Sequence, residues 1–357
     1  MTAESAPRQD ADPTQPARIA PEDLPIALEP IIRRRLAGAD QARITGWTRA
    51  PHGYSTETYL FEVTGLDGPD LGLVLRRPPE FSILPDFDLR RQYLVMQRLA
   101  GSPVPVPTMR WIETDPTELG TPYFVMDRLY DAETVSDVPP YHESGIYAET
   151  DDAGRAAMWN ACVDVIADVH AIDPARYRLG FLDLKAFGGA PPERLANFLR
   201  YGINWAAGER RIDQRLSGAL DWLDQHLYVP ERIGLCWGDA RMSNVLYRPD
   251  TTVAAALDWE ISYLGDPAAD LAWMFMSDWV SSPLPDRAPA PGTPSREETL
   301  ERYRERTGHR IGDMRFSDVT AALLLAVPLI RLTERLGLDV DLGEICAQRV
   351  EFVLDGD

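Results

Sequence analysis

The stretch from Leu235 to Glu260 constrains this chain more than any other, because single polar residues stand between short apolar runs. Val253 to Leu257 is a run of small and branched apolar residues, which is typical of a buried strand. Asp239 precedes this run, Asn244 follows Asp239 by five positions, and Asp258 comes directly after the run. This order predicts a loop and a strand that present two carboxylates and an amide together.

Two carboxylates and an amide in this order are the groups that phosphoryl transfer requires. Asp239 can orient a hydroxyl group, and Asn244 with Asp258 can hold Mg²⁺ against the phosphates of a nucleotide. Any one of the three residues alone is better explained as a turn or cap residue. The three together, in order and flanked by predicted strands, favour catalysis.

Composition excludes several classes of partner. The 357 residues carry a formal net charge of -20, so nucleic acids and anionic membranes would be repelled and a cationic substrate attracted. The three cysteines have no metal-ligand spacing and indicate reduced thiols. The longest apolar run, 319–330, is short for a membrane span and contains Pro328. The N-terminus lacks the pattern of a signal peptide, so we expect a cytoplasmic protein. We expect it to be a monomer or a homodimer.

The chain divides by pattern into a tail and two lobes. Residues 1–21 are rich in Pro, Ala, Asp and Gln and predict a disordered or loosely held tail. Residues 22–127 are mostly strand-like and predict a strand-rich lobe, whereas helical spacing dominates residues 128–357 and predicts a helical lobe. The clearest local signals are three strands and one helix, at 59–63, 71–75, 122–126 and 89–99.

The segment from Asp131 to Asp152 contains seven acidic residues and no lysine or arginine. Such a segment can attract a polyamine-like substrate. A solvated insertion explains it equally well.

The sequence resembles the aminoglycoside phosphotransferase and choline kinase-like family. The resemblance covers nearly the whole chain after residue 40, and it implies an α+β, bilobal protein-kinase-like fold with an antiparallel-sheet N-lobe and a mostly helical C-lobe. It also implies that the N-lobe, residues 22–127, binds nucleotide and that the C-lobe, residues 128–357, is catalytic and binds the substrate. Its motifs are Trp237-Gly238-Asp239 with Asn244, Asp258-Trp259-Glu260, Gly265-Asp266-Pro267 and Asp270-Leu271-Ala272. Within the family, 75–79 and 104–107 are most similar to the branch related to the kinase-like domain fused to some acyl-CoA dehydrogenases.

The resemblance implies ATP and Mg²⁺ as cofactors, Asp239 as the base, and Asn244 and Asp258 as the metal ligands. It implies backbone contacts to adenine around residues 127–129. Asp266 and Asp270 are predicted to cap and anchor a helix. The residues implied to contact the nucleotide are Gly53, Ser55, Thr56, Arg76, Gln92, Asp127 and Leu129.

Three positions depart from the family pattern. The only lysine is Lys185 in the helical half, so Arg76 on the third strand is the substitute for the nucleotide-binding lysine. Gln92 stands where the family usually has glutamate and can accept a hydrogen bond from Arg76 without supplying a countercharge. Trp237 replaces the usual histidine before Gly-Asp, and we expect its packing to brace the loop instead.

The sequence leaves the acceptor open. An aminoglycoside, which would imply antibiotic resistance, and a choline-like amine both fit the negative charge. A hydroxyacyl-CoA fits the branch resemblance and would need local arginines such as Arg194, Arg200, Arg210 or Arg211. A nucleotide-binding regulatory pseudokinase is an alternative of another class, motivated by Gln92 and Trp237.

Overall fold

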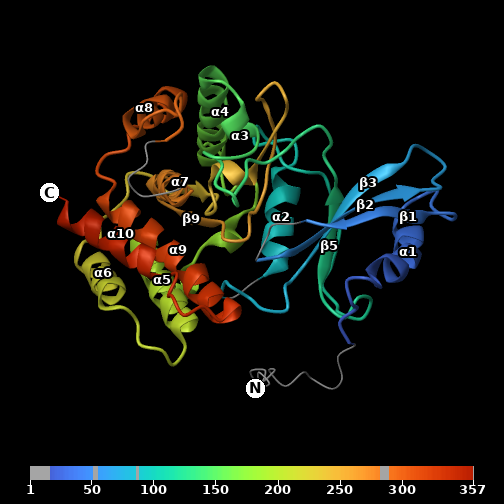
Figure 1. The fold of residues 1–357 in the computed structure, drawn as a ribbon, viewed down its shortest axis with the longest axis horizontal. Coiled ribbons are helices and arrows are strands. Elements are labelled where there is room, and N and C mark those ends of the chain that lie inside the picture. The colour runs from blue at the N-terminus through green and yellow to red at the C-terminus, as the bar shows by residue number, and fades with distance from the viewer. Residues whose placement is uncertain (1–16, 51–54, 86–87, 282–288, 357) are drawn as a thin grey trace. The chain divides into compact units, whose positions relative to one another are not determined.

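The computed structural model describes residues 17–50, 55–85, 88–281 and 289–356, and they form two compact units. The first unit contains the described residues up to Pro79 together with Met109–Arg128. The second contains Glu80–Thr108 and the described residues from Leu129 onward. Both units are coloured by position along the chain in Figure 1.

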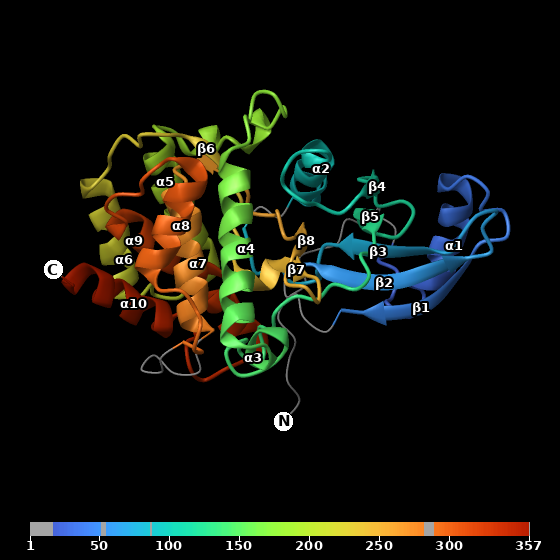
Figure 2. The same ribbon diagram turned by 90° about the horizontal axis from the view of Figure 1, so that it is seen from above.

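The first unit is built on a five-stranded antiparallel sheet in the order β1-β2-β3-β5-β4 (Figure 2). Helix α1 (Leu24–Arg35) packs its apolar side against alternate residues of β2, including Tyr59 and Phe61. Burial alternates along β2 because successive side chains of a strand point to opposite faces. The strands are β1 (Arg43–Arg49), β2 (Glu57–Thr64), β3 (Leu71–Arg77), β4 (Met109–Glu113) and β5 (Tyr123–Asp127).

The second unit is mostly helical, and two short antiparallel strand pairs, β6 with β9 and β7 with β8, carry its polar loop. Its strands are β6 (Gly234–Cys236), β7 (Val245–Tyr247), β8 (Val253–Ala256) and β9 (Tyr263–Gly265). Its α-helices are α2 (Leu89–Leu99), α3 (Ile146–Glu149), α4 (Asp152–His170), α5 (Pro191–Ala207), α6 (Gln214–Gln225), α7 (Ala268–Val280), α8 (Arg296–Thr307), α9 (Arg315–Leu336) and α10 (Glu344–Asp355).

This architecture confirms the predicted α+β fold class. The three predicted strands lie within or within one residue of β2, β3 and β5, and the predicted helix coincides with α2. One difference concerns residues 80–108, which the sequence places in the N-lobe. They belong to the second unit, where the Ala256 amide donates to the Pro105 carbonyl at 2.8 Å.

Helix α9 is longer than the apolar run 319–330 on which the sequence-based expectation about a membrane span rests. It continues through Pro328 and reaches 22 residues, so it alone, in the ranges described, is long and apolar enough to cross a bilayer. Of its most apolar window, 61% is buried inside the protein. Because α9 packs against α5, α7 and α10, burial in the core accounts for its apolar composition.

Residues 17–21 are held in place, although the sequence assigns them to the loose tail. The Ile19 amide donates to the Leu119 carbonyl at 3.2 Å, and Ile19 accepts from Nη1 of Arg77 at 2.8 Å. Arg18 donates to the Pro78 carbonyl at 2.6 Å. The buried Arg77 needs acceptors for its donors, and this segment supplies one.

Candidate active site

The loop that follows β6 carries the candidate base. Gly238 has φ of 86°, a left-handed conformation that glycine adopts readily. A Cβ atom at this position would lie 2.2 Å from the Ile261 carbonyl oxygen. Glycine is therefore required immediately before Asp239, and a 3₁₀ turn, Met242–Asn244, then leads into β7.

A buried carboxylate holds this loop by its backbone. Asp270 of α7 accepts hydrogen bonds from the amides of Trp237 at 2.7 Å and Gly238 at 2.9 Å. His170 Nε2 lies 3.0 Å from the same carboxylate, and His170 Nδ1 lies 2.9 Å from the Tyr303 hydroxyl. Asp270 thus braces the loop that carries Asp239, whereas the sequence assigned it only to capping and anchoring its own helix. The sequence did not predict the role of His170.

The expected cost of removing this brace is large. In Asp270→Asn the amide replaces one acceptor oxygen with a donor, so one buried hydrogen bond to the loop is lost and a donor faces another donor. We expect the free energy of unfolding to fall by about 2–3 kcal/mol in urea titrations. Asp168→Asn, which removes a partly exposed ion pair with Arg306, is the control and should cost less than about 1 kcal/mol. Equal effects of the two substitutions would contradict the bracing role.

Trp237 braces the loop by packing, as the sequence predicts. Its ring is fully buried and stacks on that of Trp259, with ring centroids 5.3 Å apart. Its Nε1 donates to the Leu257 carbonyl at 2.8 Å. With tryptophan in place of histidine, the loop is still supported through its backbone by Asp270 and through the packed side chain of Trp237.

Asp239 is fixed in orientation by two side chains. Nε1 of Trp273, on α7, donates to Asp239 Oδ1 at 2.8 Å, and Arg241 Nε lies 3.0 Å from the same oxygen. Burial raises the pKa of Asp239 above its usual value; the charge of Arg241 opposes this effect and that of Asp258 adds to it. A raised pKa suits a carboxylate that must accept a proton.

Arg241 also joins the loop to the acidic segment. Its Nη1 lies 3.0 Å and 3.1 Å from the two oxygens of Asp137. In the same segment, Asp151 accepts from the Gly154 amide at 2.7 Å, and Asp152 pairs with Arg155 at 2.6 Å. Because these three carboxylates already have partners within the protein, the segment offers less negative charge to a polyamine-like substrate.

Sequence reasoning missed Trp273, Arg241 and Asp137 as contributors to the site. Trp273 had a local signal, because it lies three positions after Asp270 and so on the same face of α7. Arg241 lies two positions after Asp239. Asp137 had no signal beyond its charge.

A backbone hydrogen bond between Leu257 and Asn244 brings the two predicted metal ligands, Asn244 and Asp258, close together. Asn244 is buried and donates through Nδ2 to the Asp239 carbonyl at 2.9 Å, which leaves its Oδ1 as the ligand atom. The Leu257 amide donates to the Asn244 carbonyl at 2.8 Å, so Asp258 follows immediately beside Asn244. Asp258 has φ of 55°, a conformation uncommon outside glycine and concentrated at functional sites.

The side-chain oxygens of Asn244 and Asp258 fit Mg²⁺. They are oxygen atoms, and Mg²⁺ is commonly bound by one or two carboxylates with water and substrate phosphates completing its shell. Within the described ranges no group of three or more His, Cys, Asp or Glu side chains is arranged for a metal. The fit is therefore to an ion shared with phosphate oxygens and not to a metal held by the protein alone.

In the first unit, the nucleotide-side candidates surround β2 and β3. Gly53 lies outside the described residues, whereas Ser55 and the buried Thr56 directly precede β2. Arg76 is 6% exposed on β3 and pairs in register with Thr58 and Phe124.

The neighbouring Arg77 serves the core of the first unit. Its Nε donates to Glu57 at 2.7 Å. Burial acts to raise the pKa of Glu57, but the hydrogen bond and charge of Arg77, together with the charge of Arg18 and the hydrogen bond from Tyr59, outweigh it, and the pKa is lowered. Arg76 and Arg77 thus point to opposite faces of β3, and only Arg76 remains a candidate for phosphate.

The remaining candidates are divided between the two units. Asp127 ends β5, and its carboxylate pairs with Arg110; the adjacent Arg128 amide donates to the Gly72 carbonyl at 3.0 Å. Gln92 lies on α2 in the second unit, 1% exposed, and neither polar atom of its side chain has a hydrogen-bond partner among the described residues. The pairing of Arg76 with Gln92 stays a prediction, as do the nucleotide contacts.

The antiparallel sheet of one unit and the mostly helical second unit, which carries Asp239, Asn244 and Asp258, are the features that the sequence predicts for a phosphotransferase. A model of the phosphotransferase enzyme family, also called APH, matches residues 46–306, and the chain belongs to this family. The resemblance inferred from the sequence is thereby confirmed.

Relatives by sequence include acyl-CoA dehydrogenase family member 10 of Mus musculus, 29% identical over 66% of this chain and 20% of that protein. Acyl-CoA dehydrogenase family member 11 of Homo sapiens is 26% identical over 64% of this chain and 29% of that protein. The chain spans only about a third or less of the length of these relatives.

Similar solved structures support the fold. A putative aminoglycoside phosphotransferase from Ralstonia eutropha has a TM-score of 0.68 at 24% identity, covering 92% of this chain and 96% of that one. Choline kinase from Cryptosporidium parvum has a TM-score of 0.58 at 14% identity, covering 92% and 93%. A thermostable mutant of aminoglycoside phosphotransferase APH(4)-Ia, in complex with AMP-PNP and hygromycin B, has a TM-score of 0.57 at 16% identity, covering 93% of this chain and 100% of that one.

Proposed function

We propose that this phosphotransferase moves the γ-phosphoryl group of ATP to a hydroxyl group of a small molecule, in a reaction that depends on Mg²⁺. The observation that carries the proposal is Asp239, a buried carboxylate fixed by Trp273 and Arg241. It lies on the same loop as Asn244, and Asp258 follows the strand that returns to that loop.

Asp239 acts on the acceptor. Trp273 and Arg241 both contact its Oδ1, so we assign Oδ2 to the substrate hydroxyl. The raised pKa of Asp239 lets it take the hydroxyl proton as the new bond forms. Most of the acceleration comes from alignment of the reacting groups, because the loose transition state needs little covalent help from the protein.

Asn244 and Asp258 would hold Mg²⁺, which when bound neutralises charge on the phosphate oxygens. For the nucleotide we assign phosphate contacts to Gly53, Ser55, Thr56 and Arg76. Adenine contacts fall to the backbone of Asp127 and Leu129, because the Arg128 amide is engaged in the sheet. The AMP-PNP bound to APH(4)-Ia supports the use of a nucleotide here.

The charged side chains do not distinguish between the candidate acceptors. Arg194 pairs with Asp183, Arg200 with Asp221 and Asp224, and Arg210 with Glu334. These arginines therefore offer less to a hydroxyacyl-CoA than the sequence suggested. The acidic segment likewise offers less to an amine.

Two sets of relatives therefore define the candidates to be tested. Those named as acyl-CoA dehydrogenase family members favour a hydroxyacyl-CoA, and the solved structures named for aminoglycosides and choline favour a cationic hydroxyl compound. A regulatory pseudokinase is the candidate of another class, and the buried amide of Gln92 is the feature that favours it.

A screen with γ-labelled ATP tests the proposal. The acceptors are aminoglycosides, choline-like amines and hydroxyacyl-CoAs, and the Asp258→Ala protein is the control. We expect Mg²⁺-dependent label transfer to one class, with the control inactive. Nucleotide binding without transfer to any acceptor would select the pseudokinase.

A further inference from the structure

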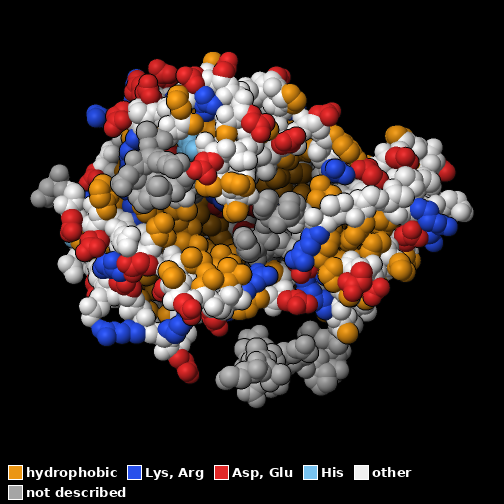
Figure 3. All heavy atoms as spheres, in the orientation of Figure 1, with side chains coloured by type: hydrophobic (Ala, Val, Ile, Leu, Met, Phe, Trp, Pro, Cys, Tyr) orange, Lys and Arg blue, Asp and Glu red, His pale blue; other side chains and the backbone are white. Residues whose placement is uncertain are grey.

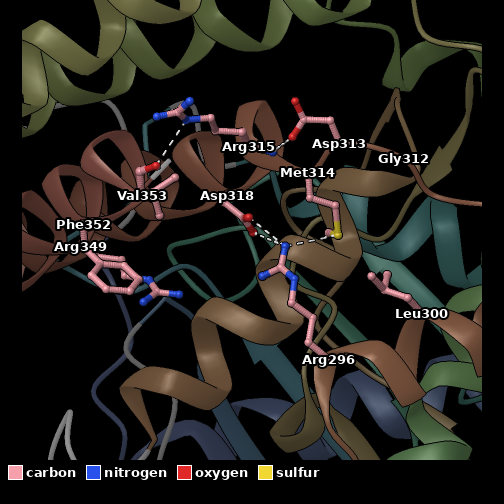
Figure 4. A pocket seen from close by; sticks show the side chains of 11 residues that line it. Arg296, Leu300, Gly312, Asp313, Met314, Arg315, Asp318, Arg349, Phe352 and Val353 are labelled. Atoms are coloured by element: carbon pink, nitrogen blue, oxygen red, sulfur yellow. Dashed lines mark hydrogen bonds and ion pairs between the residues drawn. The ribbon is translucent and has the colours of Figure 1, made fainter.

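A polar cavity of 490 Å³ lies in the second unit, built from elements that carry none of the candidate catalytic residues (Figure 4). It lies between the start of α8, the turn into α9 and the last turns of α10. Its charged lining residues are Arg296, Arg315, Arg349, Asp313 and Asp318. Three positive and two negative side chains leave one positive charge in excess, in a chain whose net charge is -20.

Two of the three arginines are already engaged. Nη2 of Arg296 donates to both oxygens of Asp318, at 2.9 Å and 2.7 Å. Arg315 donates through Nε to the Val353 carbonyl at 3.3 Å and through Nη2 to the Leu354 carbonyl. Arg315 therefore satisfies the C-terminal end of α10, and Asp318 is matched by Arg296.

Arg349 is the positive charge that remains. Its guanidinium group lies over the rings of Trp279 and Phe352, 5.0 Å from each ring centroid. Over the described part of the chain it makes no hydrogen bond or ion pair. Burial lowers the pKa of Arg349, the charge of Arg296 adds to this effect, and that of Asp318 opposes it. Asp318 offsets this cost only in part, because its two oxygens are already bound by Arg296, and a bound anion would offset more of the cost of burying the Arg349 cation.

We propose that this cavity binds the phosphate group of a small molecule through Arg349 and Arg296. Figure 4 shows both guanidinium groups turned toward the same space. Arg296 engages Asp318 through Nη2 alone, and guanidinium groups form strong, charge-assisted hydrogen bonds to phosphate oxygens. Phe352, 67% exposed on the lining of the cavity, offers an apolar surface to the rest of the ligand.

The site is local and does not belong to a basic surface. The acidic residues of α8, Glu297, Glu298, Glu301 and Glu305, line a separate hollow with Arg302. Acidic side chains gather over α8 in Figure 3. An anion that reaches the cavity is therefore held by specific contacts, since long-range attraction from this surface is absent.

Calorimetric titration of the full chain tests the site. The probes are inorganic phosphate and glycerol 3-phosphate, at constant ionic strength set with chloride. We expect Arg349→Gln to weaken binding by about ten-fold or more, because one charge-assisted hydrogen-bonding group is lost. Arg349→Lys should retain part of the affinity, and Arg304→Gln, an exposed arginine paired with Glu301, should retain all of it.

Tighter binding of glycerol 3-phosphate would assign the site to a phosphate monoester, and tighter binding of inorganic phosphate would assign it to the free ion. Unchanged affinity in a folded Arg349→Gln, or no binding of either probe to the wild-type protein, would overturn the proposal. The experiment needs no catalytic turnover, so its result is independent of the proposed function.

Discussion

Asp239→Ala is expected to lower kcat by about 10³-fold or more and to change the dissociation constant for ATP by less than about threefold. The substitution removes the group assigned to the acceptor hydroxyl. The assigned nucleotide contacts lie on other residues. Steady-state transfer rates and calorimetric titration with ATP measure the two quantities separately.

The interpretation of this variant depends on a folded loop. Arg241 keeps its pairing with Asp137 when Asp239 is removed, and Asp270 still holds the backbone of the loop. Asp239→Asn is the matched variant, because its amide keeps the volume of the side chain and removes the proton acceptor. Both variants should be equally inactive. Transfer by Asp239→Ala at the wild-type rate would remove Asp239 from the mechanism.

Gly238→Ala is expected to have the largest effect on stability, about 3 kcal/mol or more of the free energy of unfolding. The new Cβ atom would lie 2.2 Å from the Ile261 carbonyl oxygen and 2.7 Å from its carbon. Backbone atoms cannot move aside as a flexible side chain can. The left-handed φ of 86° adds strain for any residue with a Cβ atom.

A second glycine separates steric clash from backbone strain. Gly308 has φ of 74° at the C-terminal cap of α8, and a Cβ atom there would meet nothing within 4 Å. Gly308→Ala should therefore cost only the conformational term, about 1 kcal/mol. Urea titrations of both variants measure the difference. Equal losses would show that the contact with Ile261 does not constrain the loop.

Local patterns were sufficient to predict much of this fold. The alternation in β2 and the helical spacing in α2 are properties of consecutive residues, and both elements fall where the sequence places them. Helix α9 shows the limit of local reasoning. The sequence shows an apolar run of only 319–330 with Pro328 inside it, whereas the helix continues through Pro328 over 22 residues because it packs against neighbouring helices.

The candidate site, like the fold, could be predicted only where it depends on local sequence. Asp239, Asn244 and Asp258 could be identified because their spacing reflects one loop and one returning strand. The contacts that support them join residues far apart in sequence: Arg241 with Asp137, and His170 with Asp270. Such pairs depend on how the helices pack, and a single sequence carries no periodic signal for them. The position of Gly53 lies outside the described residues.

The most direct test of the central claim follows the γ-phosphoryl group itself. With the acceptor found in the screen, transfer of label from γ-labelled ATP is measured with Mg²⁺ and with excess chelator, for the wild-type and Asp258→Ala proteins. The account predicts label on the acceptor only for the wild-type protein in the presence of Mg²⁺. Equal transfer in chelator, or by Asp258→Ala at the wild-type rate, would contradict it.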